Sequence, residues 1–490
     1  MRLAFFYSIC VSIFFLGGCL PQSESSSLAD STPFVEPVLE EMVSTPIPPR
    51  PQYEPGALVL YTAQTGDTLP ALAAHFNTSV KEILAANDVI PTEATTLPPG
   101  LPMQIPIYYL PFWGTQFRMI PDSLFINGPA QVDFDTAMFV GNHEGWLRDY
   151  QEYAAGDRRS GAQIVDYVAG KFSVSPRLLL ALLEYQAGAL SQSELPSDVD
   201  VLYPMGFKNQ GYRGLYLQLA WTANQLNDGY YGWRLGTLRQ ISHRDGTIER
   251  PDPWQNAASV ALQDYFARHA AFSNNYAVAV GPDGLFCTYQ DLFGDPWSNV
   301  QDHIAGSIQQ PEMRLPFEVG KTWAFTGGPH TAWGTGNPWA AIDFAPPSIS
   351  QGCAPSSEWN TAVADGIVAR SETGIVELDL DGDGDVRTGW VVFYLHLATI
   401  DRAEGGTLLK AGDPIGHPSC EGGTSTGTHV HIARKYNGEW IAADGPLPFS
   451  LSGWIAHNGD APYQGTLTRY SAEVTASTSS NQSTWITADQ

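Results

Sequence analysis

The chain has few positive charges for its length. Its 490 residues include 25 Lys and Arg against 51 Asp and Glu, which gives a formal net charge of −26. This balance argues against binding to nucleic acid and against a basic patch for an anionic membrane surface. An acidic surface is most often that of a soluble protein, so the charge by itself identifies no partner.

Long apolar runs are equally scarce. One run covers residues 3–16, after a single positive charge at Arg2 and before a group of small residues. It is too short and wrongly flanked for a stable membrane span, and it predicts a secretory signal over residues 1–18. An ordinary signal peptide with an incidental cysteine is one interpretation. The order Leu16-Gly17-Gly18-Cys19 resembles a bacterial lipobox, which implies a lipid on Cys19 and an extracytoplasmic protein held at the cell envelope by that anchor alone.

A chain of this length is too long for one ordinary core, so several domains are expected. Residues 19–56 are rich in Ser, Pro, Glu and Thr, and residues 467–490 contain the run TASTSSNQSTW. Such segments bury little apolar surface, which predicts a disordered tether over 19–56 and a disordered tail over 466–490.

Residues 57–108 predict a small βααβ domain. A strand is followed by two short helices, the second capped by Thr78 or Ser79, and by a closing strand. The runs Gly66-Asp67-Thr68-Leu69, Phe76-Asn77 and ILAAN at 83–87 resemble a lysin-motif (LysM) domain. This resemblance implies binding to N-acetylglucosamine-containing glycans such as peptidoglycan, the alternative being a small domain with no ligand.

Residues 115–310 carry apolar positions at helical spacing and predict a mostly α-helical middle domain. The run SPRLLLALLEYQAG loosely resembles the catalytic helix of lysozyme-like lytic transglycosylases. Gln186 stands where that family has its acid, and Glu184 lies two positions earlier, about half a helical turn away. A glycan-binding or inactive relative and a plain helical spacer are therefore the alternatives for this domain.

Residues 311–465 change to short strands and Gly-rich turns, which predicts an all-β domain of antiparallel sheets. His330 stands thirteen residues before Asp343, and His396 lies in an alternating strand, GWVVFYLHL. In GTHVHIARK, His429 and His431 would share one strand face because successive side chains alternate. Two imidazoles on one face suit a metal ligand beside a proton-transfer group, although a half-buried strand with polar residues outward would give the same pattern.

These separated motifs together resemble the zinc endopeptidases of the lysostaphin and β-lytic type, peptidase family M23. The resemblance implies one zinc ion per chain, bound by His330, Asp343 and His431, with His396 and His429 beside it as catalytic residues. The commoner family spacing would place the first ligand at position 339, which is Trp339. The first ligand is therefore expected to be His330, in the longer arrangement of the β-lytic branch.

The predicted function is zinc-dependent hydrolysis of peptide bonds in peptidoglycan, next to glycine if the resemblance extends to the substrate groove. Two alternatives are a non-catalytic wall-binding regulator and a glycan-cleaving enzyme acting through Glu184. The acidic stretch 379–385 matches the start of a Ca²⁺ loop, but Trp390 stands where that loop needs a bidentate Glu. An acidic hairpin turn is therefore favoured over a calcium site.

Five cysteines are present. Cys10 lies in the predicted signal and Cys19 would carry the lipid, which leaves Cys287, Cys353 and Cys420. An exported protein sits where disulfides persist, and the last two cysteines both fall in loops near the expected active-site end of the β-domain. They predict a disulfide, with Cys287 left over and buried among aromatic residues.

Overall fold

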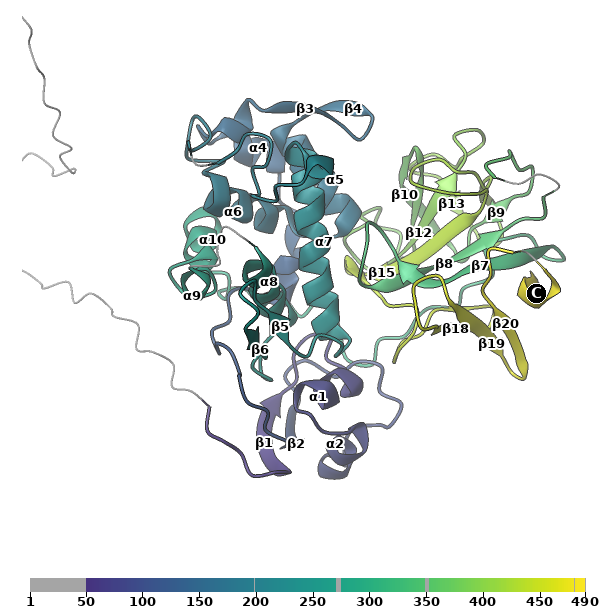
Figure 1. Ribbon diagram of the computed structural model, residues 1–490. Helices are drawn as coiled ribbons and strands as arrows, with labels where there is room; N and C mark the ends of the chain where they lie inside the picture. The colour runs from purple at the N-terminus through teal and green to yellow at the C-terminus, as the bar shows by residue number, and fades with distance from the viewer. Residues whose placement is uncertain (1–49, 198, 270–274, 349–351, 480, 490) are drawn as a thin grey trace, which may run out of the picture. The chain divides into compact units, whose positions relative to one another are not determined.

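The computed structural model describes residues 50–490 apart from 198, 270–274, 349–351, 480 and 490 (Figure 1). The predicted signal at 1–18, the lipidation site at Cys19 and most of the tether at 19–56 lie outside the described residues. Among the helices that the structure does describe, none combines the length and the apolar character needed to cross a membrane.

The lysin-motif segment folds as the predicted βααβ unit, since its two strands pair antiparallel with Ala57 opposite Ile107. The Ser79 hydroxyl accepts a hydrogen bond from the Glu82 amide, and the Glu82 carboxylate accepts one from the Ser79 amide. This capping box fixes Ser79 as the cap of the second helix. The elements are β1 (Ala57–Thr62), α1 (Leu69–His75), α2 (Val80–Ala86) and β2 (Pro102–Ile107).

The middle region is helical, as predicted, and α6–α8 are buried over most of their length. Its α-helices are α3 (Asp122–Phe125), α4 (Thr136–Gly141), α5 (Gly161–Phe172), α6 (Pro176–Ala187), α7 (Leu215–Arg234), α8 (Ala257–Arg268), α9 (Tyr276–Ala279) and α10 (Leu285–Phe293). Short 3₁₀ helices and hairpins join them: η1 (Pro129–Gln131), η2 (Trp146–Arg148), η3 (Gln210–Tyr212), β3 (Gln151–Ala154) with β4 (Asp157–Ser160), and β5 (Ile241–Ser242) with β6 (Ile248–Glu249).

The Glu184 side chain holds the turn that follows α6. Gly188 ends this helix in the left-handed conformation, and the chain then turns back. The Glu184 carboxylate accepts hydrogen bonds from the Leu190 and Ser191 amides, at 2.7 and 3.2 Å, and from the Ser191 hydroxyl. These contacts tie both of its oxygens to the turn that follows α6, which gives Glu184 a part in ending this helix.

The C-terminal region is built on an antiparallel sheet with strand order β13-β10-β11-β12-β15-β8-β7-β21, and β16 pairs with β15. One face of this sheet covers an apolar core that includes Ile342, Val392 and Ile432. Its strands are β7 (Thr322–Thr331), β8 (Trp339–Ala345), β10 (Gly366–Glu372), β11 (Gly374–Asp379), β12 (Trp390–Leu397), β13 (Leu408–Leu409), β15 (Val430–Tyr436), β16 (Glu439–Trp440) and β21 (Trp485–Thr487). Smaller sheets use β9 (Asn360–Thr361), β14 (Pro414–Gly416), β17 (Ser450–Leu451), β18 (Trp454–Asn458), β19 (Gly465–Arg469) and β20 (Ala472–Thr475), and η5 (Gln482–Thr484) precedes β21.

Two sequence-based expectations are wrong here. The described residues of the segment 466–490 do not form a disordered tail, because β21 pairs with β7 and buries Ile486 in the core of the sheet. Its Ser- and Thr-rich composition hides four apolar residues that lie in the core: Leu467, Val474, Ile486 and Ala488. Cys287 is exposed rather than buried, because α10 turns Leu285 and Tyr289 inward and a residue two positions from each lies on another face of the helix.

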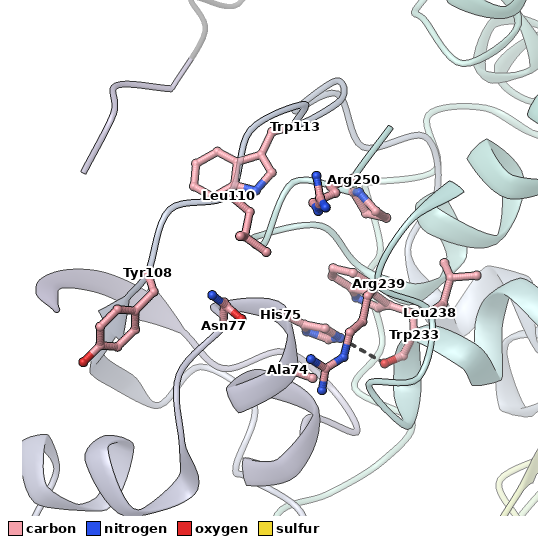
Figure 2. A pocket seen from close by; sticks show the side chains of 11 residues that line it. Ala74, His75, Asn77, Tyr108, Leu110, Trp113, Trp233, Leu238, Arg239 and Arg250 are labelled. Carbon is pink, nitrogen blue, oxygen red and sulfur yellow. Dashed lines mark hydrogen bonds between the residues drawn. The ribbon is translucent and has the colours of Figure 1, made fainter. Parts of the chain in front are cut away.

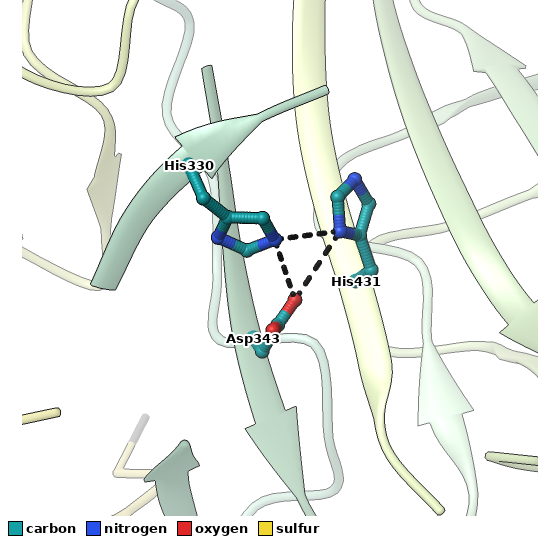
Figure 3. Close-up of side chains that lie close together, drawn as sticks. All are labelled: His330, Asp343 and His431. Carbon is teal, nitrogen blue, oxygen red and sulfur yellow. Dashed lines mark hydrogen bonds and ion pairs between the residues drawn. The ribbon is translucent and has the colours of Figure 1, made fainter. Parts of the chain in front are cut away.

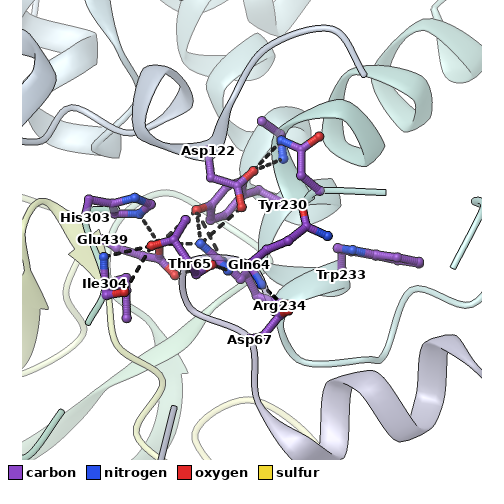
Figure 4. Close-up of polar contacts among 12 residues, drawn as sticks. Gln64, Thr65, Asp67, Asp122, Tyr230, Trp233, Arg234, His303, Ile304 and Glu439 are labelled. Atoms are coloured by element: carbon purple, nitrogen blue, oxygen red, sulfur yellow. Dashed lines mark hydrogen bonds and ion pairs between the residues drawn. The ribbon is translucent and has the colours of Figure 1, made fainter. Parts of the chain in front are cut away.

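A buried polar cluster joins the β-domain to the helices and the lysin-motif unit (Figure 4). Glu439 on β16 accepts hydrogen bonds from the Tyr230 hydroxyl at 2.8 Å and from Arg234 Nη2 at 3.2 Å, and its Oε2 lies 2.7 Å from His303 Nε2. Arg234 Nη2 also lies 3.3 Å from Asp122 Oδ2, and its Nη1 donates to the Thr65 carbonyl. Arg234 and Glu439 are both buried, so each charge depends on the other to compensate for its lost hydration.

This cluster predicts an acid-sensitive contribution to stability. Burial alone would raise the pKa of Glu439, but Arg234 and the hydrogen bond with His303 outweigh it and lower the pKa to about 2. A carboxyl group with a lowered folded-state pKa stabilises the fold above its unfolded value, near 4.5, and loses that contribution as the pH falls toward 2. We expect the difference in free energy of unfolding between the wild type and Glu439→Gln to shrink over this window. Urea titrations at successive pH values measure it, and parallel pH profiles for the two proteins would contradict it.

Candidate metal centre

Three predicted ligands meet on one face of the large sheet, on strands that are distant in sequence. His431 on β15 lies directly opposite Asp343 on β8, and directly paired residues in a sheet point to the same face. His330, at the end of β7, pairs with Ala341, two residues before Asp343 and therefore on the same side. Gly327 faces Asp343, where a Cβ atom would lie 2.4 Å from Oδ2, so only glycine leaves room for that carboxylate.

The side chains of His330, Asp343 and His431 converge on one point (Figure 3). The hydrogen bonds that the two imidazoles make with main-chain carbonyls show that this cluster fits a cation. A carbonyl oxygen can only accept, so His330 Nδ1 donates to the Gly328 carbonyl at 2.8 Å and His431 Nε2 donates to the Ala332 carbonyl at 3.0 Å. In neutral rings the opposite nitrogens are then bare lone pairs, 2.9 Å apart, and each lies 3.3 Å from Asp343 Oδ1.

Lone pairs that face one another without a hydrogen repel unless a positive charge lies among them. Asp343 Oδ1 is buried and has no hydrogen-bond donor of its own. Two imidazoles and one carboxylate are the donor set of catalytic zinc sites, which keep a fourth position open. The cluster of His330, Asp343 and His431 is therefore a zinc site.

The pKa shifts of His330 and Asp343 also show that a positive charge among these side chains is favourable. Burial works to lower the pKa of His330, yet the neighbouring Asp343 carboxylate raises it above its ordinary value. Burial would raise the pKa of Asp343, but His330 and His429 hold it well below its usual range. Burial lowers the pKa of His431. The Asp343 carboxylate thus favours a positive charge at its histidine neighbour.

His396 reaches the same face through a distortion of β12. Its neighbour Leu395 pairs with His431, so in a regular strand His396 would point to the opposite face. The pairing of β11 with β12 shifts register at this point, and His396 has a left-handed φ of 67°. Its ring then lies 4.5 Å from that of His429, between centroids. A non-glycine residue in this conformation is strained, and such residues are concentrated at functional sites.

His396 and His429 present the same protonation pattern. His396 Nδ1 donates to the Glu421 carbonyl at 2.9 Å, and His429 Nδ1 donates to the Gly427 carbonyl at 2.8 Å. Each neutral ring therefore keeps a bare Nε2, and that of His429 lies 3.8 Å from Asp343 Oδ2. Burial, together with the nearby histidines, lowers the pKa of His396 to about 3, so it is neutral at neutral pH. Both rings therefore present an unprotonated nitrogen beside the metal centre.

Comparison with known proteins adds to this geometry. Residues 118–307 match the family described as LasA, N-terminal domain, and residues 61–106 match the LysM domain. Protease LasA of Pseudomonas aeruginosa is 27% identical over 387 residues, which are 75% of this chain and 83% of that protein. The β-lytic metalloendopeptidase of Lysobacter enzymogenes is 28% identical over 166 residues, 32% of this chain and 86% of that enzyme. The chain is a LasA-like M23 metallopeptidase with a LysM domain.

Among solved structures, the M23 metalloprotease pseudoalterin aligns with 34% of the chain and 96% of its own length, at 23% identity and a TM-score of 0.29. The catalytic domain of lysostaphin from Staphylococcus simulans aligns with 25% of the chain and 89% of its own length, at 21% identity and a TM-score of 0.17. The zinc site, together with the similarity to protease LasA and to β-lytic metalloendopeptidase, identifies this LasA-like protein as a zinc metalloendopeptidase.

Tyr463 contacts the metal centre but belongs to none of the sequence motifs that predict this site. Tyr463, in the loop between β18 and β19, stacks on His330 with ring centroids 4.0 Å apart and is 53% exposed. The loop that carries it is tied to the strand of His330, because the Tyr463 amide donates to the Pro329 carbonyl. No motif marks this tyrosine, since its position depends on how a distant hairpin folds over β7.

The acidic stretch 379–385 forms the predicted turn, joining the antiparallel strands β11 and β12. Asp379, Asp381 and Asp383 lie close enough to hold a cation, but their carboxylates accept hydrogen bonds from amides of the same turn. These bonds account for the acidic residues as turn formers.

The predicted disulfide between Cys353 and Cys420 is formed, with Cα atoms 5.7 Å apart. It joins two loops beside the metal centre. Glu421, next to Cys420, supplies the carbonyl that orients His396, and the Thr428 amide donates to the Gly352 carbonyl at 3.0 Å. The bond therefore holds both loops where they position His396 and His429.

Removing this disulfide should cost stability and activity together. The bridge spans 67 residues, and in the chain-entropy view a loop of that size contributes about 4 kcal/mol. We expect Cys353→Ser with Cys420→Ser to lower the free energy of unfolding by roughly that amount and to lower peptidase activity. Cys287→Ser, at an exposed thiol, is the control. Denaturant unfolding monitored by fluorescence measures the change, and a double variant as stable as the control would contradict it.

Proposed function

We propose that this protein hydrolyses peptide bonds of bacterial peptidoglycan while its LysM domain holds it on the glycan. The observation that carries the proposal is the convergence of the proton-free donor atoms of His330, Asp343 and His431 on one buried point. A zinc ion bound there would supply Lewis-acid activation of a water molecule and of the scissile carbonyl. The matched LysM segment supports glycan as the partner.

The flanking histidines would carry the protons. With Nδ1–H held by the Gly427 carbonyl, His429 can take a proton from the attacking water at Nε2 and return it to the leaving amine. Its side chain is 17% exposed, whereas that of His330 is 2% exposed, so His429 lies on the open side of the site. His396 arrives with the same bare Nε2, but its pKa of about 3 makes it a weak base, so the proton transfer falls mainly to His429.

The test is mass spectrometry of purified peptidoglycan after incubation with the protein, with and without phenanthroline as zinc chelator. New peptide amino termini that vanish with the chelator are expected, and they identify the bond that is cut. Intact peptides would refute the proposal and favour the wall-binding regulator, and anhydro-sugar ends would move the activity to the helical region.

His429→Ala tests the proton-transfer role. Loss of a positioned acid–base group lowers rates by about 10²–10⁴-fold, and we expect a loss in that range with the zinc content retained. His417→Ala is the matched control, because His417 lies in the neighbouring loop and donates to the Glu358 carbonyl. Equal activity of the two variants would remove His429 from the mechanism.

We also propose that the protein is exported and anchored by a lipid on Cys19. Support comes from the order Leu16-Gly17-Gly18-Cys19 after an apolar run, and these residues lie outside the described part of the chain. Incorporation of labelled palmitate into the wild type but not into Cys19→Ser is expected. Equal labelling of the two proteins, or no label in either, would refute the anchor.

A further inference from the structure

The loop at residues 332–338 is connected to all three zinc ligands. It joins β7, which carries His330, to β8, which carries Asp343. It also contacts the third ligand, because the Ala332 carbonyl accepts the hydrogen bond from His431 Nε2 at 3.0 Å. This bond leaves Nδ1 of His431 as the bare atom that faces the carboxylate. A metal-bound histidine depends on such a partner for its tautomer and for the orientation of its ring.

Helix α7 of the helical region holds the tip of this loop through two side-chain oxygens. Asn224 Oδ1 accepts a hydrogen bond from the Thr335 amide at 2.8 Å. Asp228 Oδ1 accepts one from the Asn337 amide, also at 2.8 Å. The two acceptors are four residues apart, so they lie on the same face of the helix. The loop is thus bound to a segment that is distant in sequence from every zinc ligand.

The loop approaches α7 so closely that only glycine fits at two of its positions. A Cβ atom on Gly334 would collide with Asn224 Oδ1, and one on Gly336 would collide with Asp228 Oδ1. Both glycines also have a left-handed φ, 77° and 82°, which residues with a side chain rarely adopt. The main chain of the loop therefore fits directly against the two acceptors.

Helix α7 is itself fixed to its neighbours. In its last turn, Trp233 lies parallel to His75 of the LysM domain, with ring centroids 3.5 Å apart and planes at 7°. His75 Nε2 donates to the Trp233 carbonyl at 3.0 Å (Figure 2). The Tyr231 hydroxyl accepts a hydrogen bond from the Trp440 amide on β16 at 3.0 Å. These contacts make α7 a fixed support for the loop.

We propose that Asn224 and Asp228 are positioning residues of the zinc centre, which act through the loop at 332–338 on the orientation of His431. While α7 holds the loop, the Ala332 carbonyl stays where His431 Nε2–H needs its acceptor, and the bare Nδ1 stays directed at the other two ligands. The helical region is then a part of the metallopeptidase and not a plain spacer. The inference concerns zinc binding alone and does not depend on which peptide bond is cut.

The zinc affinity of the full-length protein, measured by competition with a chelator of known affinity, tests this role. Loss of a partner of a metal-bound histidine lowers metal affinity by about 10–100-fold. The double variant Asn224→Ala with Asp228→Ala acts one step further out, so we expect zinc to bind about tenfold more weakly. The double variant Asn224→Asp with Asp228→Asn keeps an acceptor oxygen at both positions and should bind zinc as the wild type does.

Gln225→Ala is the matched control for these variants. Gln225 follows Asn224 on α7, and among the described residues no hydrogen bond joins its side chain to the loop at 332–338. The substitution therefore removes a polar side chain from the same helix and leaves both acceptors in place.

A second measurement uses the wild-type protein. Coupling between two events is reciprocal, so zinc should hold the loop on α7 as strongly as the held loop supports zinc. Hydrogen exchange at the Thr335 and Asn337 amides should therefore slow by about tenfold when zinc is added to metal-free protein. The Gln104 amide, which donates to Asn87 Oδ1 in the LysM domain, is the reference for any general stabilisation.

Three outcomes would overturn the proposal: equal zinc affinity of the double alanine variant and Gln225→Ala, equal losses in the alanine and the acceptor-keeping variants, or equal slowing of exchange at the loop amides and at Gln104. The exchange measurement decides the matter even if the alanine variant does not fold. Zinc affinity and exchange are read without any peptide substrate. Failure of this inference is therefore distinguishable from failure of the proposed hydrolysis of peptidoglycan.

Discussion

Asp343→Asn is expected to abolish both zinc binding and peptide hydrolysis. Asp343 supplies the negative charge among the three ligands, and its Oδ1 lies 3.3 Å from both histidine donor atoms. The amide keeps the size of the side chain but removes that charge. The Lewis-acid contribution of a catalytic metal is several kcal/mol, and each ~1.36 kcal/mol is a factor of ten, so the rate should fall by about a thousandfold or more.

Two measurements on the same preparation check this prediction: zinc per chain by elemental analysis and the appearance of new amino termini in digested peptidoglycan. His457→Ala is the control, because His457 is half-exposed on β18 and contacts Thr468 rather than the metal centre. A variant that keeps one zinc per chain and more than a tenth of the wild-type rate would show that Asp343 is not a ligand. Loss of zinc with full activity would show that the chemistry does not need it.

Glu439→Gln is expected to cause a large loss of stability for a single substitution. The substitution leaves Arg234 buried with one carboxylate partner fewer and puts an amide nitrogen in place of one of the two oxygens that Arg234, Tyr230 and His303 contact. Breaking a buried ion pair from one side costs about 3–5 kcal/mol, because the remaining charge is uncompensated. The loss should appear as a lower midpoint of urea unfolding at neutral pH, since the carboxylate is ionised there.

An exposed ion pair offers the matched control. Arg469 binds Asp489 through two contacts of 2.7 Å, and the Asp489 side chain is 57% exposed. Asp489→Asn should therefore change the free energy of unfolding by about 1 kcal/mol or less. Similar losses in the two variants would contradict the view that burial of the Glu439 cluster governs its contribution. Restoration of stability by the additional substitution Arg234→Met would support that view.

Short-range patterns predict much of the metal centre. The two-residue period of a strand places His429 and His431 on one face, and the resemblance of four separated motifs assigns His330 and Asp343 to the same metal. The LysM caps and the all-β character of residues 311–465 follow from equally local signals. Local patterns predict a strand or helix correctly where one of its faces is buried. The buried face must then be apolar, and this requirement fixes which residues point inward.

Other features required the tertiary structure because they depend on contacts between distant segments. A regular strand would turn His396 away from the zinc face, and a shift in its pairing with β11 turns it back. Tyr463 covers His330 only through the fold of the β18–β19 hairpin. Composition predicts a loose C-terminal segment, yet β7 offers an unpaired edge on which β21 adds a strand.

The sequence by itself determined the chemistry of this protein: which side chains can hold zinc, which cysteines pair and which segment resembles a glycan-binding unit. The tertiary structure decided how these groups act. It placed the bare nitrogen atoms of His330 and His431 on one carboxylate and buried Glu439 against Arg234. Residue types set the possible interactions, whereas distance and burial set their strength, and these two quantities exist only once the chain has folded.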